Sequence, residues 1–399
     1  MDRELDSLPA NLPEGNATEW AIRNNIFWQA SWQKQELQNQ DNPFKDGKTY
    51  VITGGTGGIG LEVARRIGTQ NQVYLVLVSR SAIPSRASKK GQSDRYKKLF
   101  ETLDEIKANG SQTLLIEADV TRPEMVENIK QQAQGAFGKV HGIFHAAGVL
   151  FDRPILLKEK VTLDQVLRPK MEASYSLAKT FSDSEFLLLF SSISSAIPPA
   201  GQYDYSAGNQ YMDALANHYA NQPEALRIHS VNWASWREVG MAARHRNLPG
   251  AEFLQEEFEN GIELDEGFEC IKRALSSGIR QLLVYPRDFI SAYSRHGNSR
   301  QESIEPVKPE ELDESYEPPQ NELETQLLEF FAKAIKRRDI GVVDEFFDLG
   351  GDSLSAVSML TRIRQETGVT LPNTILYQAP HVRALAKYIE GQQLSLIHI

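Results

Sequence analysis

Residues 48–290 alternate short apolar runs, rich in β-branched residues, with longer amphipathic stretches. An apolar strand followed by a helix and another strand implies parallel pairing with right-handed crossovers. We therefore predict an α/β domain of Rossmann type, with a doubly wound parallel sheet covered by helices on both faces. The expected strands are Thr49–Thr53, Val73–Val78, Thr113–Glu117, Gly142–His145, Phe186–Phe190, Ile228–Asn232 and Gln281–Val284.

Length and charge limit what else the chain can be. Its 399 residues exceed what one hydrophobic core usually holds, so we expect more than one domain. The single cysteine, Cys270, allows no internal disulfide and suits a reducing compartment. A net charge of −10 argues against a nucleic-acid partner, and no apolar run approaches the ~18 residues that a membrane span needs. We expect a soluble, cytoplasmic protein without a metal site.

An acidic, proline-rich stretch marks the boundary between two domains. From Glu302 to Glu324 there are nine acidic residues and one basic residue. Such a segment has little apolar surface to bury, and its like charges keep it extended. We predict a linker at 296–321, between a main domain at 48–295 and a smaller domain at 322–393. The second domain shows helical stretches and no strong strand, which predicts a small all-α bundle.

The first predicted strand runs directly into Gly54-Gly55-Thr56-Gly57-Gly58-Ile59-Gly60, and a helical pattern follows. Glycines let this turn adopt positive φ and bring the backbone close to a pyrophosphate. The N–H groups at the start of the helix would then face that anion. The strand before and the helix after are the context that a dinucleotide site requires, so we favour it over a purely structural turn.

The end of the second predicted strand indicates which nucleotide is bound. A carboxylate there would grip a ribose 2′-hydroxyl, but this chain has Ser79 and Arg80. Arginine accommodates a 2′-phosphate, so we predict NADPH rather than NADH; the alternative is a surface arginine without a ligand. Asp119, followed by Val120, ends the third strand and could meet the adenine, or could be a solvated loop aspartate.

Candidate catalytic residues follow the fifth predicted strand. Ser191 and Ser192 come directly after that strand, at the carboxyl edge of the sheet, where ligands bind in such folds. Tyr205 comes thirteen residues after Ser192, and an ammonium group nearby would lower its pKa. A classical short-chain dehydrogenase would have lysine four residues after the tyrosine, but this chain has Asn209 there. The candidate replacement is Lys170, expected at the start of the preceding helix. Taken singly, these residues could be a core aromatic, a serine-rich loop and a solvated lysine.

Five motifs in order carry a resemblance to a known family. The motifs are the glycine-rich turn, His145-Ala146-Ala147-Gly148, Arg168-Pro169-Lys170, Phe190-Ser191-Ser192, and Tyr205 with Asn209. Together they resemble the ketoreductase domain of modular polyketide synthases, within the short-chain dehydrogenase/reductase superfamily. The resemblance implies that Tyr205 donates a proton, Ser192 binds the substrate carbonyl, Lys170 orients the ribose and tunes Tyr205, and Asn209 completes the site. It also places Ala146, Ala147 and Gly148 at the cofactor.

Other segments bear on the stereochemistry of the product, on the substrate site and on the N-terminal part of the chain. Leu150-Phe151-Asp152 resembles the leucine–aspartate–aspartate motif of B-type ketoreductases, although Phe151 departs from it, and Ile197 stands where A-type enzymes have tryptophan. The resemblance thus implies a D-configured hydroxyl. Asn232–Trp236 with Gly240-Met241-Ala242 resembles a substrate loop and lid, or is a buried aromatic pair. Residues 1–47 would be a remnant of the family's structural half, with one strand around Phe27–Trp32.

The second domain contains a serine motif, Asp348-Leu349-Gly350-Gly351-Asp352-Ser353-Leu354, before a helix expected from Ser355 to Thr367. A serine at a helix N-terminus is exposed, and the helix dipole favours a phosphate attached there. The alternative is that Asp352 or Ser353 only caps the helix. The motif resembles acyl- and peptidyl-carrier domains, which implies 4′-phosphopantetheine on Ser353, attached by a phosphopantetheinyl transferase.

The combined prediction is a reductase joined to its carrier. NADPH would reduce a carrier-bound β-ketoacyl thioester to a β-hydroxyacyl thioester, within a modular polyketide or hybrid polyketide/non-ribosomal peptide synthase. Partners would be an upstream ketosynthase and acyltransferase and the downstream modules. The alternatives are α-ketoacyl reduction in a peptide-synthase module, or a non-catalytic scaffold in which only the carrier works.

We interpret residues 394–399, Leu394–Ile399, as a non-native tail, because they do not continue the preceding helical pattern and match what the end of a common sequencing adapter would encode. The chain would then be a truncated reading frame with further domains after it.

Overall fold

The computed structural model describes residues 20–23, 26–37, 42–88, 90–152, 155, 158–199, 201–220, 222, 226–240, 260–298, 316–335, 337, 339–349, 351, 353–369, 371–372 and 375–396. These fall into two compact units, one within 1–151 and 159–298, the other within 152–158 and 299–399. Among the described helices, none combines the length and the apolar character needed to cross a membrane.

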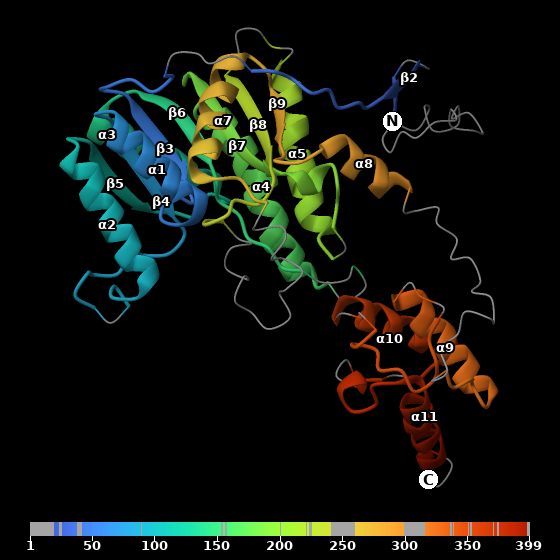
Figure 1. Ribbon diagram of the computed structural model, residues 1–399. Coiled ribbons are helices and arrows are strands. Elements are labelled where there is room, and N and C mark those ends of the chain that lie inside the picture. The colour runs from blue at the N-terminus through green and yellow to red at the C-terminus, as the bar shows by residue number, and fades with distance from the viewer. Residues whose placement is uncertain are drawn as a thin grey trace. The chain divides into compact units, whose positions relative to one another are not determined.

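A seven-stranded parallel sheet forms the centre of the larger unit (Figure 1). The strand order is β5-β4-β3-β6-β7-β8-β9, and every neighbouring pair is parallel. The order reverses between β3 and β6, which is where a doubly wound fold opens its binding crevice. All seven predicted strands are confirmed, with these bounds: β3 Thr49–Thr53, β4 Tyr74–Ser79, β5 Gln112–Glu117, β6 Val140–His145, β7 Phe186–Ser192, β8 Arg227–Trp233 and β9 Gln281–Val284.

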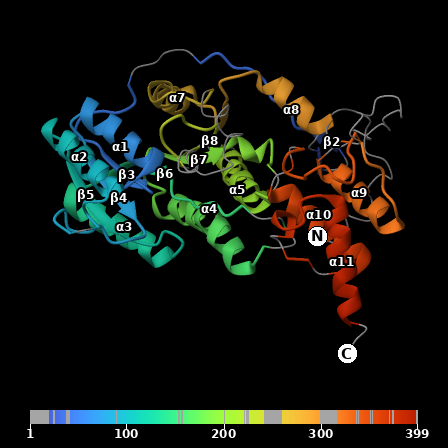
Figure 2. The same ribbon diagram turned by 60° about the horizontal axis from the view of Figure 1, so that its bottom comes forward.

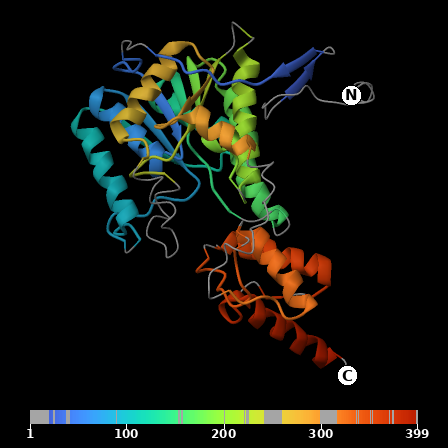
Figure 3. The same cartoon turned by 45° about the vertical axis from the view of Figure 1, so that its right-hand side comes forward.

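Helices cover both faces of the sheet, as predicted. One face packs against α1 (Gly58–Gln70), α2 (Asp94–Ala108) and α7 (Leu264–Ser277). The other packs against α3 (Pro123–Phe137), α4 (Lys160–Thr180) and α5 (Tyr203–Ala220), which follow one another along that face in Figure 2. Figure 3 views the sheet from the side, with α2 in cyan and α5 in yellow-green on its opposite faces.

Strand residues alternate between the two cores because successive side chains point to opposite faces. In β3, Tyr50 and Ile52 lie in the core beneath α1 and α7, whereas Val51 lies in the core beneath α3 and α4. All three side chains are buried. This burial on both faces explains why the strands read as continuous apolar runs in the sequence.

The N-terminal segment holds a hairpin rather than the single strand expected there. β1 (Trp20–Arg23) and β2 (Ile26–Gln29) pair antiparallel in a two-stranded sheet of their own. The strand predicted around Phe27–Trp32 corresponds to β2 but ends at Gln29. β1 was not predicted from the sequence. Downstream of β2, the Trp32 ring meets Phe289 of α8 (Phe289–Asn298) edge to face at 5.4 Å.

The smaller unit is all-helical, as predicted. It comprises α9 (Glu322–Ile335), α10 (Ser353–Thr367), a short 3₁₀ turn η6 (Ile375–Tyr377) and α11 (Val382–Leu396). Its own core includes Leu327, Phe331, Phe346, Ile363 and Leu385.

α11 continues through Leu396, so the expectation that the helix stops before Leu394 is wrong. Among the side chains that the structure describes in α11, Ile389 is the last one in the core, and backbone hydrogen bonds can carry a helix past a buried residue. Residues 397–399 lie outside the described residues.

The C-terminal part of the predicted linker contacts the carrier unit. The Glu317 carbonyl accepts a hydrogen bond from the Val342 N–H at 3.0 Å, and the Glu317 carboxylate pairs with Arg383 of α11. Arg383 also pairs with the buried Glu324 at 3.2 Å. The acidic composition that suggested an extended segment is neutralised locally by this arginine. Residues 299–315 lie outside the described part of the chain.

Candidate active site

The glycine-rich turn between β3 and α1 has no room for side chains at its key positions. Gly54 has φ of +71°, and a Cβ there would lie 2.9 Å from the Ala146 carbonyl oxygen. A Cβ at Gly60 would lie 2.6 Å from the Gly54 oxygen. α1 begins after Gly57 without a side-chain cap, so its first N–H groups are not taken by a capping side chain. The turn therefore has the form of an anion cradle.

The other predicted cofactor residues gather at the same edge of the sheet. Backbone hydrogen bonds join the ends of neighbouring strands. The Gly54 N–H donates to the Val78 carbonyl at 2.9 Å, and the Ala146 N–H donates to the Thr53 carbonyl at 3.1 Å. The Ala118 N–H donates to the Ser79 carbonyl at 2.9 Å. These bonds bring together the turn and the segments with the predicted residues Ser79, Arg80, Asp119, Val120, Ala146, Ala147 and Gly148. Arg80 is exposed, as a phosphate ligand would need to be.

Asp119 is partly used by its own loop. One oxygen of its carboxylate accepts from the Thr121 N–H at 3.0 Å and from the Thr121 hydroxyl at 2.8 Å. This turn shapes the segment after β5, and it supports a structural role beside any contact with adenine.

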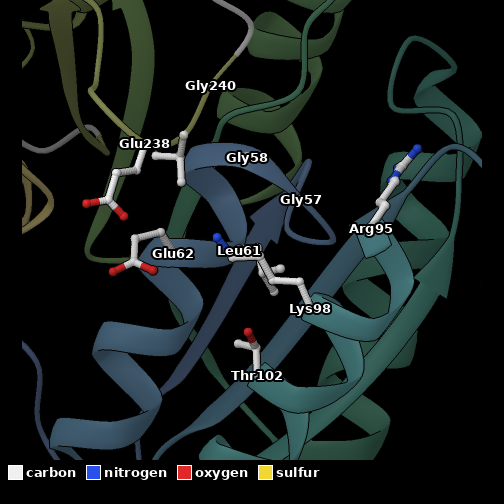
Figure 4. Close-up of a pocket in the computed structure, with 10 residues that line it drawn as sticks. Gly57, Gly58, Leu61, Glu62, Arg95, Lys98, Thr102, Glu238 and Gly240 are labelled. Atoms are coloured by element: carbon white, nitrogen blue, oxygen red, sulfur yellow. The ribbon is translucent and has the colours of Figure 1, made fainter. Parts of the chain in front are cut away.

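A pocket of about 480 Å³ opens beside the glycine-rich turn (Figure 4). Arg95 and Lys98 reach it from α2, and Glu62 and Glu238 lie together on its opposite side. Sequence reasoning missed this pocket because α2 is distant in the chain and shows only an ordinary amphipathic pattern. The full lining is Gly57, Gly58, Leu61, Glu62, Arg95, Lys98, Thr102, Glu238, Val239 and Gly240.

His145 connects the turn to the helix that holds the candidate lysine. Its Nδ1 lies 2.7 Å from the Thr53 hydroxyl, and its Nε2 lies 2.7 Å from the Pro169 carbonyl oxygen. A carbonyl only accepts, so Nε2 carries the proton and Nδ1 accepts from Thr53. Burial lowers the pKa of His145 to about 4, which keeps the ring neutral. The sequence motif contained His145 but did not reveal this role.

Lys170 lies in the interior of α4, so its expected position at the start of a helix is wrong. Proline usually marks the first turn of a helix, which is why Pro169 suggested a boundary. Here α4 begins at Lys160 and continues through Pro169. The hydrogen bond from His145 to the Pro169 carbonyl anchors the helix one residue before Lys170.

The Lys170 ammonium is buried next to Tyr205. The side chain is 3% exposed, and Nζ lies 4.8 Å from the centroid of the Tyr205 ring. Nζ also donates to the Phe190 carbonyl at 3.4 Å. Burial lowers the pKa of Lys170 to about 7, and the charge of Asp213 opposes that shift. A lysine poised near neutrality beside a tyrosine is suited to acid–base chemistry.

A glycine in α5 makes this approach possible. A Cβ at Gly208 would lie 3.1 Å from the Lys170 side chain, closer than an ordinary contact. Glycine within a helix normally costs stability, so its presence three residues after Tyr205 was a signal that sequence reasoning overlooked.

The remaining catalytic candidates surround the end of β7. Ser192 is half-buried, and its Oγ accepts from the Ser194 N–H at 3.2 Å, capping the short 3₁₀ helix η3 (Ile193–Ser195). Asn209 is fully buried and donates to the Ser194 hydroxyl at 3.0 Å. Ser191 is buried and donates to the Asn209 carbonyl at 3.4 Å. The internal bond of Ser191 supports Ser192 as the serine available to a substrate.

The segments predicted to shape the substrate site have mixed outcomes. Trp233 and Trp236 are buried with their rings 5.2 Å apart, so they form the aromatic pair given as the alternative. Gly240 lines the pocket, whereas Met241 and Ala242 lie outside the described residues. Phe151 is 41% exposed.

In the smaller unit, Ser353 is the first residue of α10, two residues earlier than the predicted start of that helix. The Gly351 N–H donates to the Phe346 carbonyl at 2.9 Å, and a Cβ at Gly351 would overlap the Phe346 ring. Glycine is therefore required two residues before the serine. Gly350 and Asp352 lie outside the described residues.

Known proteins resemble both units. Residues 48–238 match the family described as KR domain, and residues 325–389 match the family described as phosphopantetheine attachment site. The 6-methylsalicylic acid synthase of Arthrobotrys oligospora is 27% identical over 369 residues, covering 86% of this chain and 20% of that protein. Erythronolide synthase EryA3 of Saccharopolyspora erythraea is 29% identical over 401 residues, covering 96% of this chain and 12% of the relative. The chain thus spans a fifth or less of these relatives.

Solved structures of ketoreductases are also similar to this chain. PlmKR1, the ketoreductase from the first module of phoslactomycin biosynthesis in Streptomyces sp. HK803, is 25% identical with a TM-score of 0.59, covering 71% of this chain and 63% of that one. Residues 48–238 therefore form a KR domain similar to the ketoreductases of polyketide synthases, which are oxidoreductases, and residues 325–389 form a phosphopantetheine attachment domain.

Proposed function

We propose that the larger unit reduces the β-ketone of an acyl thioester to a β-hydroxyl, with NADPH as the reductant. The acyl chain would be tethered through 4′-phosphopantetheine on Ser353. The observation that carries this proposal is the buried Lys170 ammonium, 4.8 Å from the Tyr205 ring centroid, at the carboxyl edge of the sheet. A scaffold without chemistry would have no use for a buried lysine with a pKa of about 7.

The residues at the glycine-rich turn fit a dinucleotide. The absence of side chains at Gly54 and Gly60 and the uncapped start of α1 suit a pyrophosphate. The exposed Arg80 suits a 2′-phosphate and thereby favours NADPH. The bound nicotinamide would supply the hydride.

The chain's own residues would handle the proton. Ser192 would donate a hydrogen bond to the substrate carbonyl oxygen. Tyr205 would transfer its phenolic proton to that oxygen as the carbonyl carbon becomes a C–H centre, which leaves a tyrosinate. The Lys170 ammonium would stabilise the tyrosinate charge, and Asn209 would hold the Ser194 segment beside it.

The carrier and its partners complete the proposal. A phosphopantetheinyl transferase would modify Ser353 in the cytoplasm, and an upstream ketosynthase and acyltransferase and downstream modules would build and use the acyl chain. Leu150-Phe151-Asp152 favours a B-type site that gives a D-configured alcohol.

The test is reduction of soluble thioesters by the purified full chain. We expect NADPH consumption with β-ketoacyl N-acetylcysteamine thioesters and little with α-ketoacyl ones. Preference for the α-keto substrates would support the peptide-synthase alternative, and no consumption with either class would refute the reductase proposal.

A matched pair of variants assigns the chemistry to Tyr205. Tyr205→Phe should lower kcat by roughly 10²–10⁴-fold while NADPH still binds, because only the transferable proton is lost. Tyr211→Phe, on the same helix but partly buried against the hydrophobic core on that face of the sheet, should keep its activity. Equal activity of the two variants would exclude Tyr205 as the proton donor.

A further inference from the structure

A buried carboxylate lies behind the candidate catalytic residues. Asp213 stands on α5, four residues after Asn209 and eight after Tyr205, so the three side chains share one side of the helix. Asp213 is 6% exposed. No arginine or lysine forms an ion pair with it within the described part of the chain. A carboxylate buried in this way is costly unless several donors satisfy it.

Strand β8 supplies two of those donors. The Ser230 hydroxyl donates to one oxygen of Asp213 at 2.5 Å, and the Asn232 amide donates to the other at 2.6 Å. Ser230 and Asn232 are two residues apart on β8, so both side chains point to the face covered by α5. Burial still raises the pKa of Asp213, despite hydrogen bonds from Ser230, Asn232, Ser195 and Ser191.

Asn232 connects this carboxylate to the serine segment. Its amide also donates to the Ser195 hydroxyl at 2.5 Å and lies 3.2 Å from the Ser191 Oγ. In the parallel ladder, Asn232 is the direct partner of Ser191. An amide nitrogen has only two hydrogens, and its two shortest contacts are Asp213 and Ser195. The hydrogen bond to Asp213 therefore fixes the orientation of the Asn232 amide, whose other hydrogen bonds the Ser195 hydroxyl of the serine segment.

We propose that Asp213 is a positioning residue for the reduction, because its carboxylate orients Asn232, and Asn232 holds the Ser191–Ser195 segment that carries Ser192. Ser192 depends on this segment directly, since its Oγ accepts from the Ser194 N–H. Asp213 touches no substrate in this role. Its charge also acts on the buried Lys170 and favours the ammonium form.

The inference rests on the reduction proposed above, and its first test is kinetic. Asp213→Ala should lower kcat for a β-ketoacyl thioester by on the order of 10²-fold, because small displacements of a reacting group cost that much. The NADPH dissociation constant should change by less than about threefold, because the glycine-rich turn holds the nucleotide through its own backbone. A merely structural residue would weaken both together.

Exchanging Asp213 and Asn232 tests whether the hydrogen bond between the two side chains matters, or only the volume that they fill. In the double variant Asp213→Asn with Asn232→Asp, one amide still faces one carboxylate, and the hydroxyls of Ser230 and Ser195 can either donate or accept. We expect the swap to recover activity to within about tenfold of the original chain. Ser111→Ala is the control, because it removes a buried hydroxyl that bonds Gly68 and Asn71 before β5, and it should lower stability without lowering kcat.

Amide hydrogen exchange tests the same inference without turnover. The N–H groups of Ala196 and Ile197 donate to the Ile193 carbonyl, both at 2.9 Å, and close the serine segment. In Asp213→Ala these amides should exchange at least about tenfold faster, while those of β3 stay protected. Unchanged exchange at Ala196 and Ile197 would overturn the inference, as would an undiminished kcat of Asp213→Ala. If the original chain reduces no thioester, the proposed function fails, and the exchange data still decide the role of Asp213.

Discussion

The Lys170 side chain is buried and lies beside the aromatic ring of Tyr205. Two effects act on its pKa: burial lowers it to about 7, and the charge of Asp213 opposes that shift. The side chain thus titrates close to neutral pH, whereas a solvated lysine does not. At the scale of single residues, the lowered pKa of Lys170 is the property through which the mechanism can be tested most directly.

We expect kcat/KM to fall as pH rises through about 7. The ammonium form stabilises the tyrosinate of Tyr205, and the neutral amine that forms above a pKa of about 7 does not. Measurement of kcat/KM from pH 5.5 to 9 checks this, because that ratio reports the free enzyme. Lys170→Met should be slower by roughly 10²-fold and should lack this limb of the profile. The same limb in the variant would contradict the assignment.

His145 predicts a pH dependence of stability. Its pKa is about 4 in the folded chain and 6.5 when exposed, so between these values the unfolded chain takes up a proton that the folded chain does not. The free energy of unfolding should therefore fall by about 3 kcal/mol as pH drops from 6.5 to 4. His229, also with a pKa of about 4, should add a similar loss of its own.

Denaturant unfolding followed by tryptophan fluorescence checks this, because all five tryptophans belong to the larger unit. His145→Gln should reduce the acid-dependent loss, whereas His218→Gln, on the exposed surface of α5, should leave it unchanged. An acid-dependent loss of equal size in both variants would exclude His145 as a cause.

At the scale of elements, the junction of β3 and α1 is the least tolerant of side chains. A Cβ at Gly60 would collide with the Gly54 carbonyl, whereas a Cβ at Gly135 in α3 meets nothing within 4 Å. Gly60→Ala should weaken NADPH binding at least about tenfold, because the turn must shift away from the pyrophosphate.

Gly135→Ala is the matched control, since alanine within a helix stabilises it by about 0.5–1 kcal/mol and this position is distant from the turn. Titration of NADPH by fluorescence compares the two variants. Equal affinity would show that the turn does not hold the nucleotide.

α5 illustrates how one element assembles a site. It presents Tyr205, Asn209 and Asp213 at intervals of four residues, and Gly208 lets Lys170 of α4 lie against it. The tyrosine and asparagine could be predicted from their spacing and from the resemblance. The role of Asp213 could not, because its partners Ser230 and Asn232 come from β8 and only the sheet brings them together.

At the scale of the whole molecule, each unit has its own hydrophobic core. We therefore expect the two chemistries to separate. Ser353→Ala should abolish the mass increase that phosphopantetheinyl transferase produces and should leave reduction of soluble thioesters unchanged. Tyr205→Phe should keep the mass increase and should lose the reduction of soluble thioesters. Intact-mass measurement and NADPH consumption on the same samples check this, and a mass increase in Ser353→Ala would refute the attachment site.

The pattern of apolar, polar and glycine residues along the chain was sufficient to predict the seven strands, the parallel sheet, the glycine-rich turn and the carrier bundle. Each of these depends on local pattern, since apolar runs and glycines act on their own backbone. The errors lie where local signals compete with packing. Pro169 resembled a helix start but lies within α4, and the last residues of α11 remain helical without a core pattern.

The sequence by itself determined the fold class and the residue types available for chemistry, because periodicity and turn residues are properties of neighbouring positions. Only the tertiary structure decided that Lys170 is buried against Tyr205, that His145 is held neutral between Thr53 and Pro169, and that Asp213 faces Asn232. Burial, proximity and the resulting pKa shifts arise from contacts between distant segments. No pattern along the chain encodes the dielectric environment that such contacts create.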